Sequence, residues 1–376
     1  MSYFQFVPLF KPYLWLNHKG DHTLAFSLGN QAHPFFDTLN TRVEQYFTTK
    51  GISRTGNWKI YTKATLLLVS IAVVYASLLL FQSWSAQLIL WSVLGMVFAA
   101  IGFNLMHDSA HGSFSSKSWV NHMMGYSLNI IGGNVFLWKM KHNQLHHVYT
   151  NVHGVDEDID VEPFLRVNEQ QKKYWFHKYQ HIYWALIYGT TYFLWVYIKD
   201  FNKYFTRKIG ETPIRKIPRS EHIIFWVSKL FYVAVFLVTP LLVVGWVKAL
   251  VGYGVMLFVT GWIIAVVFQL AHIVEGRSFH LPETQGRTLK DEWAVHQLNT
   301  TANFATKNKL VSWLTGGLNF QVEHHLFPRI SHIHYPAISG IVRDTCEEFG
   351  LEYQEYPNVL SAVRAHISHL RILGAA

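Results

Sequence analysis

The sequence predicts an all-α integral membrane protein with four transmembrane helices, interfacial helices and a cytoplasmic histidine-rich domain. Half of its 376 residues are hydrophobic, and they are concentrated in long runs without a charge. Lysine and arginine are almost absent from the short linkers between paired runs, and clusters of histidine lie at or beyond the ends of the runs. Length alone would allow two soluble domains, but this distribution of apolar residues favours a membrane protein.

The amino-terminal part, residues 1–60, contains no run that could span a bilayer, and we expect a cytoplasmic or interfacial segment there. From Phe35 to Phe47 apolar residues recur at helical spacing. This pattern predicts an amphipathic helix, either near a membrane surface or packed on the rest of the domain. We expect no cleavable signal peptide. The single cysteine, Cys346, excludes an internal disulfide framework and a thiolate metal cage.

Four uncharged runs are long enough to cross a membrane. The first has 18 residues, which as a helix measures about 27 Å and is close to the hydrocarbon thickness of a bilayer. The second run ends directly at His107 and the fourth at His272, so two spanning helices each deliver a histidine to the membrane boundary. Within a membrane domain over 61–376, the expected spans are residues 64–81, 86–106, 230–247 and 249–271.

Two further apolar regions are weaker span candidates. Residues 113–138 are only moderately apolar and contain glycines, so we expect segments that lie on or dip into the interface. Residues 182–198 hold six tyrosine or tryptophan side chains, which favour the membrane–water interface. Both regions are therefore expected to be interfacial helices.

The positive charges predict the orientation of the chain. Lysine and arginine number 7 before the first run, 14 between the second and third runs up to Arg219, and 9 after His272. The linkers inside the two pairs of runs hold none and one, Lys248. By the positive-inside rule, residues 107–222 and 272–376 and both termini are cytoplasmic. This topology also explains the net charge of +9, and with no basic tail or binding motif we expect no nucleic-acid partner.

The densest histidine cluster lies within residues 141–147. His142, His146 and His147 stand at positions i, i+4 and i+5, so on a helix the three imidazoles can converge. An acidic loop follows, and its carboxylates could hydrogen-bond the outer ring nitrogens of metal-bound histidines or simply be solvated. The acidic residues are Asp156, Glu157, Asp158, Asp160 and Glu162.

Two more clusters lie far away in the sequence. His107 and His111 are one helical turn apart, and Gln321 precedes the adjacent pair His324 and His325 by three residues. Imidazole suits iron, copper, nickel or zinc. Other histidines, namely His153, His181, His296 and His334, are expected to be surface groups, hydrogen-bonded groups or groups that support a ligand. The polar run 300–304, which follows His296 and Gln297, could line the site.

The number of candidate ligands asks for two metal ions with open positions. There are eight candidate histidines, with Gln321 as a possible ninth ligand, whereas one octahedral ion takes at most about six. Zinc would be saturated by fewer ligands and has no redox chemistry, and neither His-Glu-x-x-His nor a Glu-x-x-His pair occurs. Copper stays open, but thiolate or thioether ligands do not accompany the clusters. An all-nitrogen two-iron centre at a membrane face favours oxygen activation on a lipidic substrate.

These residues resemble a known family. His107-Asp108-Ser109-Ala110-His111, His142-Asn143-Gln144-Leu145-His146-His147 and Gln321-Val322-Glu323-His324-His325 are similar to the three histidine boxes of integral-membrane fatty-acid desaturases. Gln321 and the following Leu326-Phe327-Pro328 resemble the front-end subgroup, which inserts a double bond between an existing one and the carboxyl end. Asn319-Phe320 and His272-Ile273-Val274 also fit, and the resemblance extends from about Ala64 to Leu370.

The resemblance implies a di-iron acyl desaturase that uses dioxygen and two external electrons to form a cis double bond. It implies iron-ligand roles for the eight histidines and leaves open whether Gln321 ligates. The substrate would be a fatty acyl-CoA or a phospholipid acyl chain among the membrane lipids. Many relatives carry a fused cytochrome domain with a His-Pro-Gly-Gly motif, but the nearest string here is His33-Pro34-Phe35-Phe36. A separate carrier, a ferredoxin or a b-type cytochrome, would supply electrons, and the unfused form resembles bacterial members in the cytoplasmic membrane.

Three other functions remain open on the sequence. A membrane hydroxylase or ketolase uses similar boxes and would add oxygen instead of forming a double bond. A histidine-rich metal transporter expects ionisable residues inside its spans, and the four uncharged runs hold none. A metal-storage or scaffold protein would not need ligands delivered by the ends of spanning helices.

Overall fold

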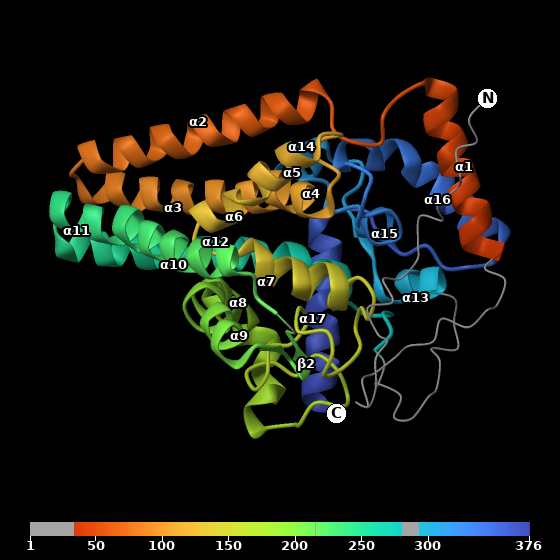
Figure 1. Ribbon diagram of the computed structural model, residues 1–376. Coiled ribbons are helices and arrows are strands. Elements are labelled where there is room, and N and C mark those ends of the chain that lie inside the picture. Colours follow the sequence, from red (N-terminus) through yellow and green to blue (C-terminus); the bar gives the residue numbers. More distant parts are fainter. Residues whose placement is uncertain (1–33, 215, 280–292) are drawn as a thin grey trace.

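The computed structural model describes residues 34–214, 216–279 and 293–376. Within these ranges, four helices are long and apolar enough to cross a membrane, which confirms the predicted number of spans. They lie side by side at one end of the molecule (Figure 1). The four are α2 (Trp58–Leu80), the helix Trp84–His111 formed by α3 (Trp84–Ile101), η1 (Gly102–Met106) and α4 (His107–His111), the helix Arg219–Val243 formed by α10 (Arg219–Val233), η5 (Ala234–Val238) and α11 (Thr239–Val243), and α12 (Trp246–His272).

The third of these helices differs from the expected 230–247. It begins at Arg219, directly after Pro218, and ends at Val243 because Gly245 adopts a positive φ of 94° before α12 begins. The prediction took the run without charged residues as the span. It therefore missed the first turns of the helix, because Lys229 lies inside the helix. The Lys229 ammonium is buried but lies 2.8 Å from the Asp200 carboxylate and donates to two backbone carbonyls, so its charge is balanced.

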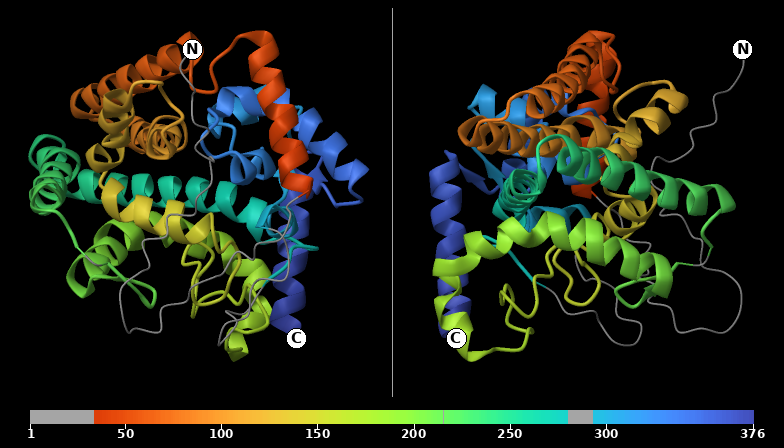
Figure 2. Two further views of the ribbon diagram at one scale, coloured as in Figure 1. Left: turned by 45° about the vertical axis from the view of Figure 1, so that its right-hand side comes forward. Right: turned by 90° about the vertical axis from the view of Figure 1, so that its left-hand side faces the viewer.

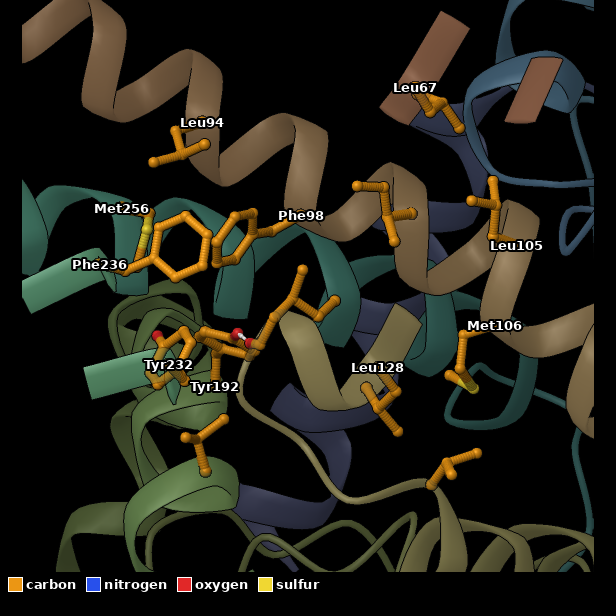
Figure 3. Close-up of a cluster of buried hydrophobic side chains, with 14 of the residues drawn as sticks. Leu67, Leu94, Phe98, Leu105, Met106, Leu128, Tyr192, Tyr232, Phe236 and Met256 are labelled. Carbon is orange, nitrogen blue, oxygen red and sulfur yellow. Dashed lines mark hydrogen bonds between the residues drawn. The ribbon is translucent and has the colours of Figure 1, made fainter. Parts of the chain in front are cut away.

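Helix α12 is the centre of the membrane part. It packs against α3 on one side and against α8 (Gln180–Leu194) on the other (Figure 1, Figure 2). Glycine allows the close approach to α8, because a Cβ at Gly261 would lie 2.7 Å from the carbonyl oxygen of Gly189. Figure 3 shows the apolar core beside these helices, where the rings of Phe98 and Phe236 meet edge to face with centroids 5.0 Å apart.

Short helices connect the second and third spans. None of them is a span candidate within the described residues, and the interfacial position of residues 113–138 and 182–198 stays a prediction. A two-stranded antiparallel hairpin follows them. In order, these elements are α5 (Ser118–Gly125), α6 (Ser127–Ile130), α7 (Val135–Lys139), η2 (Met140–His146), η3 (Trp175–Tyr179), α8, η4 (Trp195–Lys199), α9 (Asp200–Thr206), β1 (Lys208–Ile209) and β2 (Thr212–Pro213).

Most of the remaining elements gather around α15 at the other end of the spans, whereas α17 packs against α8 and η3 (Figure 1). Helix α1 (Pro34–Lys50) buries Phe35, Leu39, Val43 and Phe47 against this part, so its apolar face packs on the rest of the domain, as the second alternative predicted. A position near the membrane surface stays a prediction. The short strands β3 and β4 pair in parallel. The elements are α13 (Trp293–Thr300), β3 (Asn303–Phe304), α14 (Lys309–Leu314), α15 (Gln321–Leu326), η6 (His332–His334), α16 (Tyr335–Glu348), β4 (Glu355–Tyr356) and α17 (Val359–Ala375).

Candidate metal centre

The three histidine clusters and His272 converge on one buried site. Helix α4 supplies the first cluster, η2 and the residue after it supply the second, α15 supplies the third, and His272 is the last residue of α12. Ring centroids are 4.5 Å apart between His107 and His324, and 4.8 Å apart between His146 and His272. All eight histidines predicted as candidate ligands are therefore neighbours in space.

The nitrogen atoms form overlapping groups that could each hold a metal ion, with the atoms of a group within 4.8 Å of one another. One group belongs to the first cluster and its neighbours, another surrounds the end of α12, and a third links the two. The groups are His107, His111, His142 and His324; His146, His272 and His325; and His147, His324 and His325. Two separate groups, joined by a third that shares one histidine with each, fit the predicted need for two ions.

Wide helical turns position the first two clusters. The π-helical segment η1 directly precedes His107, and η2 contains His142 and His146. The backbone N–H of His147 donates to the carbonyl of His142 at 3.1 Å, an i to i+5 bond in place of the expected α-helical one. The wider turn brings both neighbours close to His142, with ring centroids 5.0 Å from His146 and 4.7 Å from His147.

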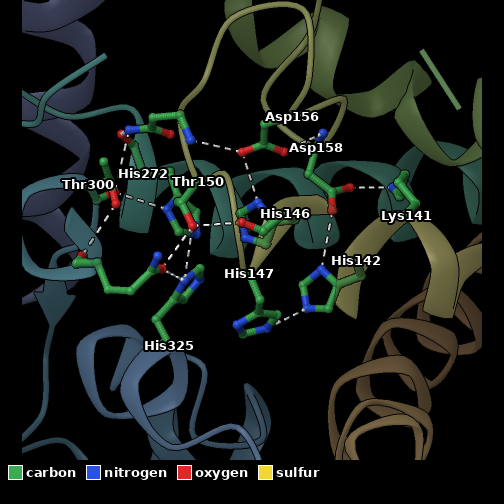
Figure 4. A network of polar contacts seen from close by, with 12 residues as sticks. Lys141, His142, His146, His147, Thr150, Asp156, Asp158, His272, Thr300 and His325 are labelled. Atoms are coloured by element: carbon green, nitrogen blue, oxygen red, sulfur yellow. Dashed lines mark hydrogen bonds and ion pairs between the residues drawn. The ribbon is translucent and has the colours of Figure 1, made fainter. Parts of the chain in front are cut away.

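The acidic loop fixes two of the histidines from outside, as Figure 4 shows. Nδ1 of His142 lies 3.2 Å from the Asp158 carboxylate, and Nδ1 of His146 lies 2.9 Å from the Asp156 carboxylate. The alternative of a loop that is only solvated is therefore wrong for these two residues. Glu157 has a different partner, the Lys203 ammonium at 2.7 Å.

Three more histidines have outer partners. His272 donates from Nδ1 to the Thr300 carbonyl at 3.1 Å, and His325 donates from Nδ1 to Oε1 of Gln297 at 2.7 Å (Figure 4). Thr300 begins the polar run 300–304, so this run does reach the site, and Gln297 lies just before it. Nδ1 of His324 lies 3.2 Å from the Tyr335 hydroxyl, a partner that no spacing in the sequence indicates.

With the outer nitrogens held, inward nitrogens are left for a metal. Five buried ring nitrogens of the candidate ligands have no hydrogen-bond partner among the described residues: His111 Nε2, His146 Nε2, His147 Nδ1, His324 Nε2 and His325 Nε2. Buried polar atoms are rarely left so, and a metal ion would satisfy them. Burial lowers the pKa of His142 to about 4 and holds the pKa values of His147, His324 and His325 well below their usual range. The rings are thus neutral near pH 7, as coordination requires.

Gln321 also faces this centre. Its side-chain Nε2 lies 3.0 Å from Nε2 of His272, whose other nitrogen donates to Thr300, so the amide is the donor to the imidazole. Its Oε1 is buried and has no hydrogen-bond partner among the described residues. The amide can therefore present an oxygen to the same site as the histidines.

Asp108 anchors the first cluster, and sequence reasoning assigned it no role. It lies between His107 and His111, and its carboxylate accepts from the Ser331 hydroxyl at 2.7 Å and pairs with Nδ1 of His332 at 2.9 Å. Helix α4 is thereby tied to η6. The histidines set aside earlier are not in the metal-binding groups: His296 contacts the Thr150 carbonyl and His334 the Thr55 carbonyl.

An apolar cavity leads to the histidines. At the centre its wall includes His107, His142 and Gln321, and away from the centre it runs between α8, α12 and the segment before α7. The apolar lining includes Met106, Leu128, Ile131, Ile187, Leu194, Ile264, Val267 and Phe268. Such a cavity accommodates an extended hydrocarbon chain with a few of its carbons at the site.

Known proteins with similar sequences agree with this geometry. The family described as Fatty acid desaturase matches residues 82–357. An acyl-lipid (8-3)-desaturase of Physcomitrium patens is 36% identical over 350 residues, covering 90% of this chain and 72% of that protein. The sn-1 linoleoyl-lipid 6-desaturases of Arthrospira platensis and Synechocystis sp. are each 34% identical, covering 90% and 92% of this chain and 92% and 97% of those proteins. The chain therefore belongs to the fatty acid desaturase family and is a membrane desaturase.

Proposed function

We propose that this chain is a two-iron, oxygen-dependent acyl-lipid desaturase of the front-end type. The observation that carries the proposal is the convergence of eight histidines, seven of them buried and His111 half-buried, at the end of an apolar cavity. The relatives above are named acyl-lipid desaturases, and two of them act on linoleoyl-lipid at position 6. A glycerolipid-bound linoleoyl group is therefore the first substrate to test.

The metal would be held in two groups. His107, His111, His142 and His324 would bind one iron, and His146, His272 and His325 the other, with His147 beside both and Gln321 near the second. Bound iron, together with dioxygen and two external electrons, supplies the oxidant that removes two hydrogens from adjacent methylenes. A site with this many imidazole ligands and no thiolate suits iron, which keeps coordination positions open. Zinc prefers a site that three or four ligands saturate.

The chain's own residues position the acyl chain and the metal ligands. The apolar cavity holds the acyl chain and excludes water from the reacting carbons. Asp156 and Asp158 keep the imidazoles of His146 and His142 in the tautomer whose Nε2 faces inward. The hydrogen bonds of His272 and His325 to Thr300 and Gln297 do the same for the second group. The rings are thus held in place before metal and substrate bind.

The proposed setting is a bacterial cytoplasmic membrane with the site on the cytoplasmic face. The distribution of lysine and arginine along the sequence supports this orientation. Electrons would come from a separate carrier, a ferredoxin or a b-type cytochrome.

The test is expression in a host fed defined unsaturated fatty acids, with the new double bonds located by mass spectrometry. A cis double bond between the existing one and the carboxyl end is expected. A product with added oxygen would instead identify a hydroxylase or ketolase. Purified protein that is active without iron would overturn the metal assignment.

A further inference from the structure

A second pocket, polar instead of apolar, adjoins the acyl cavity. It lies between the loop 154–160, helix α9 and the turn of the β1–β2 hairpin. Its lining is Gly154, Asp156, Glu157, Asp160, Lys199, Asn202, Lys203 and Gly210. Glu157, Asp160, Lys199 and Lys203 line the acyl cavity as well, so these two spaces share one rim.

The shared rim lies close to the histidines. Asp158 follows Glu157 directly, and its carboxylate is 3.2 Å from Nδ1 of His142, whose opposite nitrogen faces the centre. The His142 ring and Asp158 therefore connect the metal centre to Glu157 at the polar rim. The apolar residues Leu128, Ile131 and Tyr192 line the same cavity on its membrane side. An acyl chain that reacts at the histidines can thus keep its polar end nearby and its methyl end among the helices.

The charges of the polar pocket are mostly paired. Lys203 pairs with Glu157 at 2.7 Å, and Asp156 is held by His146. Lys199 has no carboxylate within 4.0 Å among the described residues, and its ammonium donates to the Asp160 carbonyl at 3.4 Å. The pocket therefore offers the Lys199 ammonium, the Asn202 amide and the Asp160 carboxylate to a ligand.

The balance of charge limits the kind of ligand. Two carboxylates, of Glu157 and Asp160, balance two ammonium groups, of Lys199 and Lys203, and the Asp156 side chain is not exposed to solvent. Carboxylates repel a carrier with several phosphates, such as coenzyme A, whereas a headgroup of low net charge can use both donors and acceptors. The sequence left open whether the acyl carrier is coenzyme A or a phospholipid, and the charges of the pocket favour the lipid.

We propose that this polar pocket binds the glycerol ester and headgroup of a glycerolipid whose acyl chain fills the apolar cavity. Lys199 and Asn202 donate to its ester or headgroup oxygens, and Asp160 accepts from its hydroxyl or amine hydrogens. Holding the carboxyl end here fixes which methylenes reach the histidines, so the pocket sets the position of the double bond counted from that end. This inference rests on the proposed acyl-lipid desaturase function and assigns the residues that bind the polar end of its substrate.

The test compares two carriers of the same acyl group. Purified iron-loaded protein, supplied with reduced ferredoxin, receives either dilinoleoyl phosphatidylcholine in mixed micelles or linoleoyl-CoA. Wild type is expected to desaturate the lipid in preference to the thioester. Lys199→Ala is expected to raise KM for the lipid about tenfold, the effect of losing one charge-assisted hydrogen bond. The kcat is expected to stay near that of wild type.

Matched variants separate binding from folding. Lys199→Arg should keep a KM near that of wild type, because the cation is retained. Lys208→Ala removes a lysine from the adjacent hairpin, outside the pocket, and should change neither constant. Preference for linoleoyl-CoA, or an unchanged KM for the lipid in Lys199→Ala, would overturn this inference and leave the desaturase function standing. Desaturation of neither substrate by wild type would overturn both.

Discussion

The Asp156 carboxylate lies 2.9 Å from Nδ1 of His146, and neither side chain is exposed to solvent. The same carboxylate accepts the backbone N–H groups of Asn151 and Asp158, each at 3.0 Å, so its own position is fixed by the chain. His146 is thereby held in the tautomer that leaves Nε2 bare. An outer partner of this kind orients the ring of a metal ligand and raises its basicity.

Asp156→Ala is therefore expected to weaken iron binding by about 10-fold to 100-fold, the usual effect of losing such a partner. Asp156→Asn should lose less, because its amide oxygen can still accept from Nδ1. Iron per chain after dialysis against a graded chelator measures the effect. Asp344→Ala, an exposed carboxylate on α16, is the matched control. Wild-type iron retention in Asp156→Ala would contradict the assignment.

Removing an inward nitrogen should abolish desaturation. His146→Ala or His324→Ala each deletes a ring whose bare Nε2 faces the centre, and the protein should still accumulate in the membrane. Wild type should hold about two irons per chain, as the number of ligands requires. His122→Ala, an exposed histidine on α5, should stay active. One tightly bound zinc, no iron and retained activity would refute the two-iron centre.

The sequence predicted most of the site because its information is local. Helical spacing identifies the pairs His107–His111 and His142–His146 as candidate ligands. The length of the uncharged runs predicts the four spans. The π-helical turns were not predictable, since no residue type marks an i to i+5 bond. Tyr335 was missed as the partner of His324 because that contact depends on how α15 meets η6 and α16.

Two features of the fold could not be predicted from the sequence for a similar reason. A search for uncharged runs places the start of the span after Lys229. The helix extends through Lys229 because Asp200, from another helix, balances its charge. Likewise, α1 shows an apolar face in the sequence, and only the folded domain shows that α16 covers it. Such tertiary partners have no spacing that a sequence pattern could detect.

Close packing at Gly261 should be needed for a stable membrane part. Its added Cβ would lie 2.7 Å from the Gly189 carbonyl oxygen and 2.9 Å from the Tyr192 backbone nitrogen, and backbone cannot rotate away. Gly261→Ala should therefore push α8 from α12, lower stability by about 1–3 kcal/mol and disturb the cavity wall between them.

The fraction of protein that stays monodisperse after heating in detergent checks this, together with activity. Gly254→Ala is the matched control on the same helix, because nothing lies within 4 Å of its added Cβ. A Gly261→Ala protein as heat-resistant as Gly254→Ala would show that the two helices can separate freely.

Lys173 and the carboxyl terminus should lie on the same, cytoplasmic face. The Lys173 ammonium donates to the Ala375 carbonyl at 2.8 Å, which joins the two regions directly. Cysteines placed at Lys173 and Arg371 should both react with an impermeant thiol reagent only from the cytoplasmic side. A cysteine at Gln82, in the linker between α2 and α3, should react from the opposite side. Labelling of the cysteines at positions 173 and 371 from opposite faces would refute a topology in which an even number of spans lies between these two regions.

The role of Gln321 follows from its two polar atoms. Its amide nitrogen is 3.0 Å from Nε2 of His272, and its oxygen is buried without a partner among the described residues. If His272 binds iron, that imidazole nitrogen no longer accepts from the amide, and Gln321 is then free to offer its oxygen to the metal or to hydrogen-bond a bound water. Either role needs a polar group at this position.

Gln321→Ile is therefore expected to lose nearly all activity, since it keeps bulk but neither polar atom. Gln321→His should keep measurably more, because its imidazole can coordinate or hydrogen-bond from a position one helical turn before His324. Product yields normalised to protein in the membrane, with iron per chain measured in parallel, distinguish loss of metal from loss of chemistry. Near-wild-type yield from Gln321→Ile would leave Gln321 no part in the metal centre, because packing in α15 needs only a side chain of that size.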